Sequence, residues 1–472
     1  MASIVVIATM VATLTSCATP SSYWTGPETL PAASPGETSS VEDMSCPADG
    51  GCVAVGLIKT ATASFPGVAA QNDGTWQPLQ RLSGTNEGDA VGAVACSSLG
   101  NCLAGGSFDR AFQTANSAPR YGLVAQQVNG VWQPANGVFG LDYWARGTQA
   151  DVYEISCPSD NNCVIAGSYG EIIGPLTGWG QGVQLFAAAM VNGEWERAQG
   201  FPSLESANLG GIAEIRSLSC SDARNCTITG TTTGPYLGAA ACRSETGCYA
   251  GGYTFILSLV DGTWGAPFKT PSNPAEGIPE GSALINSTSC PSRTECVGVG
   301  SANTDDGGSY AITIKKSGGT WGKPTRLQGA SLSTTSSRLL SISCFGSGLC
   351  VAGGESGGGM NQQSLLVVMK DGEWQEPQAL AELTEWDASA GARSVNSVSC
   401  SALGNCLAAG GLSDSFVASY TDGEWSQVLT VMAPTDSEAG TYLRITDCSP
   451  NGYCAAAGTS AVGSIFLSTP RS

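Results

Sequence analysis

The sequence predicts an all-β fold, a single β-propeller of four-stranded antiparallel blades, and three features predict it. Eighteen of the 19 cysteines form nine pairs with the spacing Cys-x5-Cys. A two-residue turn, Asx-Gly in six copies and Gly-Gly in a seventh, is followed two residues later by a tryptophan. Units of roughly 50 to 60 residues with four short strands each are typical of propellers, whose radial packing leaves few exposed edges.

The unit that begins near residue 395 shows why each element is expected. A strand pattern leads to Cys400, and Cys406 begins a second strand that ends at two glycines. A third strand precedes Asp422-Gly423, a strong hairpin signal because a type I′ turn needs positive φ at both central residues. The expected strands are 395–400, 406–411, 416–421 and 424–427, with a five-residue turn between the cysteines.

Each cysteine pair is expected to be a disulfide that joins the first two strands of a unit across their turn. Cysteines at opposed hairpin positions lie within disulfide reach, and nine thiol pairs without a single histidine fit disulfides better than zinc sites. The expected pairs are Cys46 with Cys52, Cys96 with Cys102, Cys157 with Cys163, Cys220 with Cys226, Cys242 with Cys248, Cys290 with Cys296, Cys344 with Cys350, Cys400 with Cys406, and Cys448 with Cys454.

Two irregularities set the expected number of blades. The Cys220/Cys226 and Cys242/Cys248 pairs follow each other closely with no turn and tryptophan between them, so one unit has lost its outer hairpin or a hairpin was inserted. The last unit has a third strand at 464–467 but no fourth, and the segment 23–31 around Trp24 resembles a fourth strand. We therefore expect a propeller over residues 23–472 that the N-terminal strand closes, with eight blades; seven or nine remain open.

The N-terminus is expected to direct export and to carry a lipid. Residues 4–14 are apolar but too short to span a bilayer, and they lead into Leu14-Thr15-Ser16-Cys17, which resembles a bacterial lipobox. This resemblance implies a signal peptide over 1–16, a lipidated Cys17 with a tether over 17–22, and attachment to the outer side of the bacterial cell membrane. An uncleaved anchor and an ordinary signal peptide are the alternatives.

Composition excludes several function classes. A net charge of −19 argues against a nucleic-acid partner, which requires a basic surface. The absence of histidine excludes imidazole bases and imidazole metal ligands. We expect a monomer with no cofactor and no bound metal.

The repeats also resemble two known propeller patterns. The glycine pairs after the second strand, such as Gly105-Gly106 and Gly353-Gly354, with a later tryptophan, resemble kelch repeats. The Asp-Gly-Thr-Trp turns are similar to the Asp-box, although Asp and Gly are adjacent here. The whole stapled unit is similar to repeats of uncharacterised exported proteins of high-GC Gram-positive bacteria. These resemblances imply the fold and leave the activity open.

The long connections between strands 2 and 3, and between blades, are the expected place for binding, because both short turns of each unit lie on the opposite face. The seven repeat tryptophans are expected to pack between blades. Three others lie in the long connections, where they either contact a ligand or fold back over the blade ends. The candidate binding residues are Asp142, Tyr143, Trp144, Arg146, Trp179, Glu385, Trp386 and Asp387.

The sequence favours a lipid-anchored, non-catalytic binding module for a glycan or a protein, with the ligand on the outer loop face away from the membrane. The alternative is a carbohydrate-active enzyme, a glycoside hydrolase or lyase that uses paired carboxylates. The loop carboxylates available for it are Asp142, Asp151, Glu171, Glu385 and Asp387.

Overall fold

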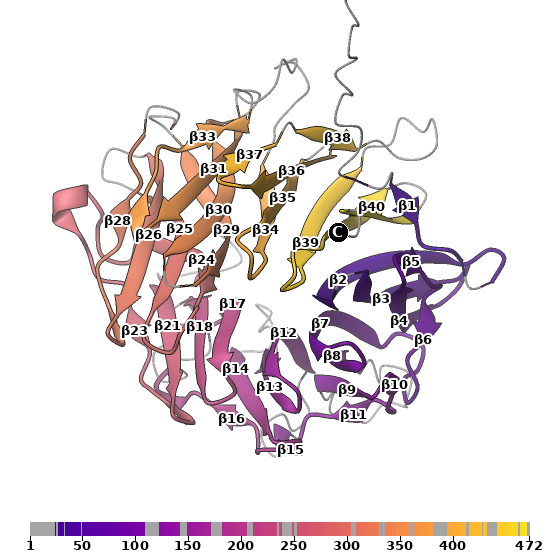
Figure 1. Cartoon of the computed structure of the whole chain (residues 1–472). Helices are drawn as coiled ribbons and strands as arrows, with labels where there is room; N and C mark the ends of the chain where they lie inside the picture. The colour runs from indigo at the N-terminus through magenta and orange to yellow at the C-terminus, as the bar shows by residue number, and fades with distance from the viewer. Residues whose placement is uncertain are drawn as a thin grey trace, which may run out of the picture.

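The computed structural model is a ring of eight blades, each an antiparallel sheet whose first strand lies nearest the central axis (Figure 1). This confirms the expected all-β propeller. The structure describes residues 24, 27–32, 34–48, 50–108, 122–141, 149–170, 182–204, 211–233, 236–237, 248–249, 253–303, 308–329, 332, 336–346, 348–358, 362–380, 394–411, 415–426, 428–431, 441–460 and 463–469.

The first four blades share one order of strands, and the outermost strand is broken into two short pieces that both pair with the third strand. Blade 1 contains β2 (Thr38–Ala48), β3 (Gly51–Lys59), β4 (Ser64–Asn72), β5 (Thr75–Trp76) and β6 (Gln80–Arg81); blade 2 contains β7 (Ala90–Ser98), β8 (Asn101–Ser107), β9 (Gly122–Val128), β10 (Val131–Trp132) and β11 (Asn136–Gly137); blade 3 contains β12 (Gln149–Ser159), β13 (Asn162–Gly170), β14 (Val183–Val191), β15 (Glu194–Trp195) and β16 (Gln199–Gly200); blade 4 contains β17 (Ala213–Asp222), β18 (Asn225–Thr232), β21 (Tyr253–Val260), β22 (Thr263–Trp264) and β23 (Phe268–Lys269).

The other four blades repeat this order, and the last one takes its outer strand from the N-terminus. Blade 5 contains β24 (Ala283–Ser289), β25 (Cys296–Asn303), β26 (Ser309–Ser317), β27 (Thr320–Trp321) and β28 (Thr325–Arg326); blade 6 contains β29 (Ser337–Phe345), β30 (Leu349–Ser356), β31 (Gln363–Lys370), β32 (Glu373–Trp374) and β33 (Gln378–Ala379); blade 7 contains β34 (Val395–Cys400), β35 (Cys406–Gly410), β36 (Ser415–Thr421), β37 (Glu424–Trp425) and β38 (Leu429–Val431); blade 8 contains β39 (Tyr442–Cys448), β40 (Cys454–Ser460), β41 (Gly463–Ser468) and β1 (Glu28–Thr29).

The ring closes where the N-terminal strand joins the last blade, as expected. Glu28 pairs with Phe466 and Thr29 with Ile465 in an antiparallel register. Trp24 packs against the apolar cluster between blades 7 and 8. The blade count is therefore eight, and the extra cysteine pair belongs to an inserted hairpin: β19 (Tyr236–Leu237) and β20 (Cys248–Tyr249) form a separate two-stranded sheet between β18 and β21.

Among the described residues the core consists of eight apolar clusters, one between each pair of neighbouring blades. Seven of them contain or contact one repeat tryptophan each, and Trp24 contacts the eighth. Trp76 of blade 1, for example, is 4% exposed, and the centroid of its ring lies 4.1 Å from that of Phe466 in blade 8. The expectation that the repeat tryptophans pack between blades is confirmed. Burial of apolar side chains between neighbouring blades stabilises the ring, because it removes apolar surface from water.

The two short turns of each blade lie on the same face, which we call the stapled-turn face; the opposite face is the long-loop face. All six Asx-Gly turns and Gly318-Gly319 have positive φ at both central residues. In blade 1 the amide of Gly74, in the outer turn, donates to the carbonyl of Gly50, in the inner turn. The same contact joins Gly130 to Gly100 in blade 2.

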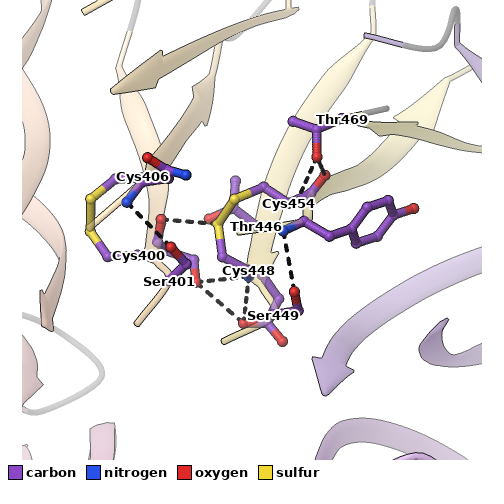
Figure 2. Close-up of a disulfide and its surroundings, with 12 residues drawn as sticks. Cys400, Ser401, Cys406, Thr446, Cys448, Ser449, Cys454 and Thr469 are labelled. Atoms are coloured by element: carbon purple, nitrogen blue, oxygen red, sulfur yellow. Dashed lines mark hydrogen bonds between the residues drawn. A yellow bond between two sulfur atoms is a disulfide. The ribbon is translucent and has the colours of Figure 1, made fainter. Parts of the chain in front are cut away.

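Eight of the nine expected disulfides are formed, with Cα–Cα distances of 4.0 to 4.1 Å, and Figure 2 shows those of blades 7 and 8 on adjacent inner hairpins. The ninth pair, Cys242 with Cys248, and the lipid-anchor candidate Cys17 lie outside the residues whose side chains are described. The bridges, in blade order, join Cys46 to Cys52, Cys96 to Cys102, Cys157 to Cys163, Cys220 to Cys226, Cys290 to Cys296, Cys344 to Cys350, Cys400 to Cys406, and Cys448 to Cys454.

The second cysteine of each bridge is a core residue and not part of an exposed site. Each is between 1% and 4% exposed, and each of the eight apolar clusters holds one of them. The disulfides therefore have a structural role: they fix the inner hairpin of a blade and fill the space between blades. These buried cysteines are Cys52, Cys102, Cys163, Cys226, Cys296, Cys350, Cys406 and Cys454.

The expected five-residue turn between cysteines is correct in blades 5, 7 and 8 but wrong in the others; in blade 6, Phe345 pairs with Leu349. In blades 1 to 4 the strands continue further past the cysteines, and Ala48 pairs with Gly51, Ser98 with Asn101, Ser159 with Asn162, and Asp222 with Asn225. A β-bulge between the first cysteine and the turn takes up the extra residue, so the hairpin closes with a two-residue turn.

Candidate ligand-binding site between blades 3 and 4

Every innermost strand carries a β-bulge whose extra residue is the fourth before the first cysteine. A bulge redirects its side chain and leaves that residue outside the ladder of backbone hydrogen bonds. The bulge residues in blade order are Glu42, Gly92, Tyr153, Arg216, Asn286, Leu340, Asn396 and Arg444.

The bulge explains a glycine inside the second strand of each unit. In blade 3 a Cβ on Gly167 would lie 2.0 Å from the carbonyl oxygen of Asp151, and in blade 1 a Cβ on Gly56 would lie 1.9 Å from that of Ser40. No side chain fits so close to a backbone oxygen. The glycines that suggested kelch repeats thus have a structural role opposite the bulge.

Several bulge side chains bridge to the next blade. Asn286 donates to the carbonyl of Leu339 at 2.7 Å, and Asn396 donates to that of Leu443 at 3.0 Å. Arg444 donates to the carbonyl of Val41 and forms an ion pair with Glu42 at 2.5 Å. These contacts tie the blades together near the axis.

The bulge residues of blades 3 and 4, Tyr153 and Arg216, instead line a cavity of about 600 Å³, which we call the blade 3–4 pocket. Asp151 and Glu214 stand two residues before them on β12 and β17, at matching positions of the two blades. The ends of the strands place this pocket on the long-loop face. The lining residues are Asp151, Tyr153, Ser168, Gly170, Val183, Ile212, Ala213, Glu214, Ile215 and Arg216.

Several polar groups surround the side chain of Tyr153, a residue that is 51% exposed. Its hydroxyl lies 3.5 Å from the Asp151 carboxylate and 3.4 Å from the hydroxyl of Ser168, which is 7% exposed. Asp151 and Ser168 are direct partners across β12 and β13. Removal of the phenol from water, and then the negative charges of Asp151 and Glu214, raise the pKa of Tyr153. The phenol therefore stays protonated and can donate or accept a hydrogen bond in the pocket.

Glu214 and Arg216 form an ion pair of 3.2 Å with about half of each side chain exposed to solvent. An exposed pair of this kind contributes little to stability. Both side chains remain available to a ligand, the guanidinium as a planar donor and the carboxylate as an acceptor. The pocket thus combines a half-exposed aromatic ring, two carboxylates, one guanidinium and a buried hydroxyl.

Three further carboxyl groups lie on the innermost strands: Asp43 on β2, Glu154 on β12 and Asp447 on β39. Burial raises the pKa of Asp43 to about 7, that of Glu154 to about 8 and that of Asp447 to about 6. Asp43 and Asp447 accept backbone hydrogen bonds from Val94 at 2.7 Å and Cys46 at 2.6 Å, which partly oppose this effect. Each carboxyl therefore links its blade to the next one, as the bulge residues do.

Within the described part of the chain, no three acidic, cysteine or histidine side chains gather in a way that would hold a metal ion. Among the same residues, no helix is both long and apolar enough to cross a bilayer.

The sequence-based site is placed only in part. Asp151, one of the carboxylates named for the enzyme alternative, lines the pocket. The other candidates lie outside the described residues: Asp142, Tyr143, Trp144, Arg146, Glu171, Trp179, Glu385, Trp386 and Asp387. Their contribution to binding stays a prediction.

Sequence reasoning missed Tyr153, Ser168, Glu214 and Arg216. A signal for two of them existed: the residue four before the first cysteine changes freely from unit to unit, whereas the residue before it is always valine, isoleucine or leucine. A variable position inside a regular repeat indicates a side chain that does not serve the shared packing.

No protein-family model matches the chain, and no curated protein matches it. Solved structures whose chains follow a similar path include the Dos1 propeller. It is 11% identical, with 94% of this chain and 95% of that chain covered and a TM-score of 0.49. A polysaccharide lyase described as an ulvan lyase is 10% identical, with 83% and 93% covered and a TM-score of 0.43. The NanB sialidase from Streptococcus pneumoniae is 8% identical, with 94% and 93% covered and a TM-score of 0.36.

Proposed function

We propose that this protein is an exported propeller that binds a glycan in the blade 3–4 pocket without transforming it, and that a lipid on Cys17 holds it at the membrane. The observation that carries the binding proposal is the half-exposed Tyr153 ring, set among Asp151, Ser168, Glu214 and Arg216 in a cavity of about 600 Å³. This volume falls within the range of roughly 300 to 1,000 Å³ common for small-ligand sites.

The chemistry of the pocket suits a sugar. A pyranose ring has an apolar C–H face that packs on an aromatic ring, and its hydroxyls take the donors and acceptors of neighbouring polar side chains. Tyr153 offers the aromatic face, while the carboxylates of Asp151 and Glu214 accept and the Arg216 guanidinium donates. A flat protein interface would not need so many polar groups in one concavity.

The test is titration of the purified mature chain with oligosaccharides first selected on a glycan array. Tyr153→Ala is expected to weaken binding about tenfold, because loss of a central aromatic contact typically costs more than 1 kcal/mol. Tyr442→Ala is the matched control, since Tyr442 lies on the innermost strand of blade 8 and is 36% exposed. Equal affinity of the Tyr153 variant and the intact protein, or no binding to any glycan, would contradict the proposal.

A second candidate function has one observation in its favour: Asp151 and Glu214 border the same cavity, and both charges act on the Tyr153 hydroxyl. Paired carboxylates around a glycosidic bond are the machinery of most glycoside hydrolases. New reducing ends, formed from the bound oligosaccharide and lost in Asp151→Asn and Glu214→Gln, would establish the enzyme. An unchanged oligosaccharide after prolonged incubation supports the binding module.

Export is supported by the eight formed disulfides, since such bridges persist in oxidising compartments outside the cytosol. The proposed anchoring rests on the sequence Leu14-Thr15-Ser16-Cys17 alone, which resembles a lipobox. A labelled fatty acid supplied to expressing cells is expected to appear on the protein and to be lost in Cys17→Ala. Labelling that persists in this variant would exclude Cys17 as the anchor.

A further inference from the structure

The charges of the blade 3–4 pocket are unequal. Arg216 is its one cation among the described lining residues, and it is paired with Glu214 at 3.2 Å. Asp151 meets the Tyr153 hydroxyl at 3.5 Å, and no ion pair joins it to a cation among the residues that the structure describes. Among the described residues, the Asp151 carboxylate therefore lines the cavity without a cation paired to it.

The carboxylates that line the pocket leave it with excess negative charge. Asp151 and Glu214 outnumber Arg216 among the described lining residues, whereas the neighbouring Glu154, whose pKa burial raises to about 8, is largely protonated at neutral pH. Glu214 and Asp151 both act on the Tyr153 phenol. The whole chain carries a net charge of −19. Charges of one sign around a concavity attract ligands of the opposite sign and repel those of the same sign.

We infer that the ligand of the blade 3–4 pocket is an amino sugar with a free, protonated amine, and not an acidic sugar. This inference rests on the proposed glycan-binding function. The ammonium pairs with the Asp151 carboxylate in a charge-assisted hydrogen bond. The adjacent Tyr153 face favours a cation as well as a sugar ring, and the Glu214–Arg216 pair takes neighbouring hydroxyls.

The experiment compares four oligosaccharides of equal length by titration calorimetry: a glucosamine tetramer, its fully N-acetylated form, a neutral glucose tetramer and a galacturonic acid tetramer. The free amine is expected to bind at least about tenfold more tightly than the acetylated and neutral forms, the range of a hydrogen bond to a charged group. The acidic tetramer is expected to bind most weakly. The preference for the amine is expected to shrink as salt increases.

Asp151→Asn keeps the shape of the side chain and removes its charge, so it is expected to abolish the preference for the amine while binding of the neutral tetramer persists. Asp371→Asn is the control, because Asp371 lies in a type I′ turn on the stapled-turn face, where asparagine also adopts positive φ. This control is expected to keep the full preference.

The outcomes separate the two proposals. Tight binding of the acidic or acetylated tetramer, or a preference for the amine that survives Asp151→Asn, would overturn the amino-sugar assignment and leave glycan binding intact. Failure of all four tetramers and of every array glycan to bind would overturn the proposed function itself.

Discussion

The two halves of the ring differ in how neighbouring blades are linked near the axis. In blades 4 to 7 the residues three and one before the first cysteine are both serine, and their hydroxyls accept backbone N–H groups of the next blade. The eight contacts measure 2.9 to 3.4 Å. We call this series the serine ladder.

In blades 8, 1, 2 and 3 at least one of the two positions is not serine. The irregular half holds the three carboxyls with raised pKa values. It also supplies Asp151, Tyr153 and Ser168 to the blade 3–4 pocket. At the two positions, blade 8 has Ile445 and Asp447, blade 1 has Asp43 and Ser45, blade 2 has Ala93 and Ala95, and blade 3 has Glu154 and Ser156.

The comparison shows that the two halves link their blades with different chemistry. A serine hydroxyl bridges two blades without carrying a charge, so the serine ladder stabilises the regular half and adds no electrostatic field. Carboxyl groups at the same positions keep some bridges, as Asp43 does to Val94 at 2.7 Å, and become negatively charged only as the pH rises through their raised pKa values of about 6 to 8. Groups with such shifted pKa values, on the side that holds the pocket, are common near functional sites.

The largest expected loss of stability comes from removing the N-terminal strand that closes the ring in the irregular half. Deletion of residues 23–31 removes β1 with the buried Leu30, and Trp24 from the cluster between blades 7 and 8. We expect a loss of at least about 5 kcal/mol, from two large apolar side chains and an uncovered strand edge. Thermal unfolding checks it. A truncated chain that melts like the intact mature protein would show that β1 does not close the ring.

A smaller loss of stability is expected when two serines of the serine ladder are replaced by alanine, the residue that blade 2 has at the same positions. Ser397→Ala with Ser399→Ala leaves the N–H group of Thr446 without a side-chain acceptor and that of Cys448 with the Asp447 carboxylate alone. We expect a loss of about 2 kcal/mol, since an unsatisfied buried donor typically costs 1 to 3 kcal/mol. Denaturant unfolding measures it.

The opposite substitution, from alanine to serine in blade 2, is the matched control. Ala93→Ser with Ala95→Ser supplies acceptors between blades 2 and 3 and is expected to leave stability unchanged or raise it slightly. A loss of similar size in both double variants would mean that the serine ladder does not determine cohesion.

A third expected effect is a pH dependence specific to the irregular half. The folded-state pKa values of Asp43, Glu154 and Asp447 are raised, so the folded state holds these protons more tightly than the unfolded chain does. Their contribution to stability is therefore full below about pH 4 and is lost as the pH rises through about 6 to 8. The free energy of unfolding should fall over this window.

Asp43→Asn together with Glu154→Gln is expected to flatten this fall, because neither replacement titrates. Unfolding curves at pH 5 and pH 8 test it, with Asp371→Asn as the control that keeps the slope. A slope that is the same in the double variant and the intact protein would remove these two carboxyls as its source.

The sequence by itself determined the repeat and its local geometry. Adjacent Asx and Gly residues take positive φ in a two-residue turn wherever they occur, and Cys-x5-Cys brings two cysteines opposite each other across one hairpin. The segment around Trp24 was recognisable as a fourth strand by its likeness to the other tryptophan strands. Turn, hairpin and blade depend on neighbours in the chain, which the sequence displays directly.

Only the tertiary structure decided the site. Asp151 and Tyr153 meet Glu214 and Arg216 because blade 3 lies beside blade 4, and because a bulge in each inner strand redirects one side chain. The serine ladder and the raised pKa values likewise exist only between blades, where a residue's partner is some 50 to 70 positions away in the chain. Charge, burial and hydrogen bonding across such distances depend on how the sheets pack, and no local pattern encodes that.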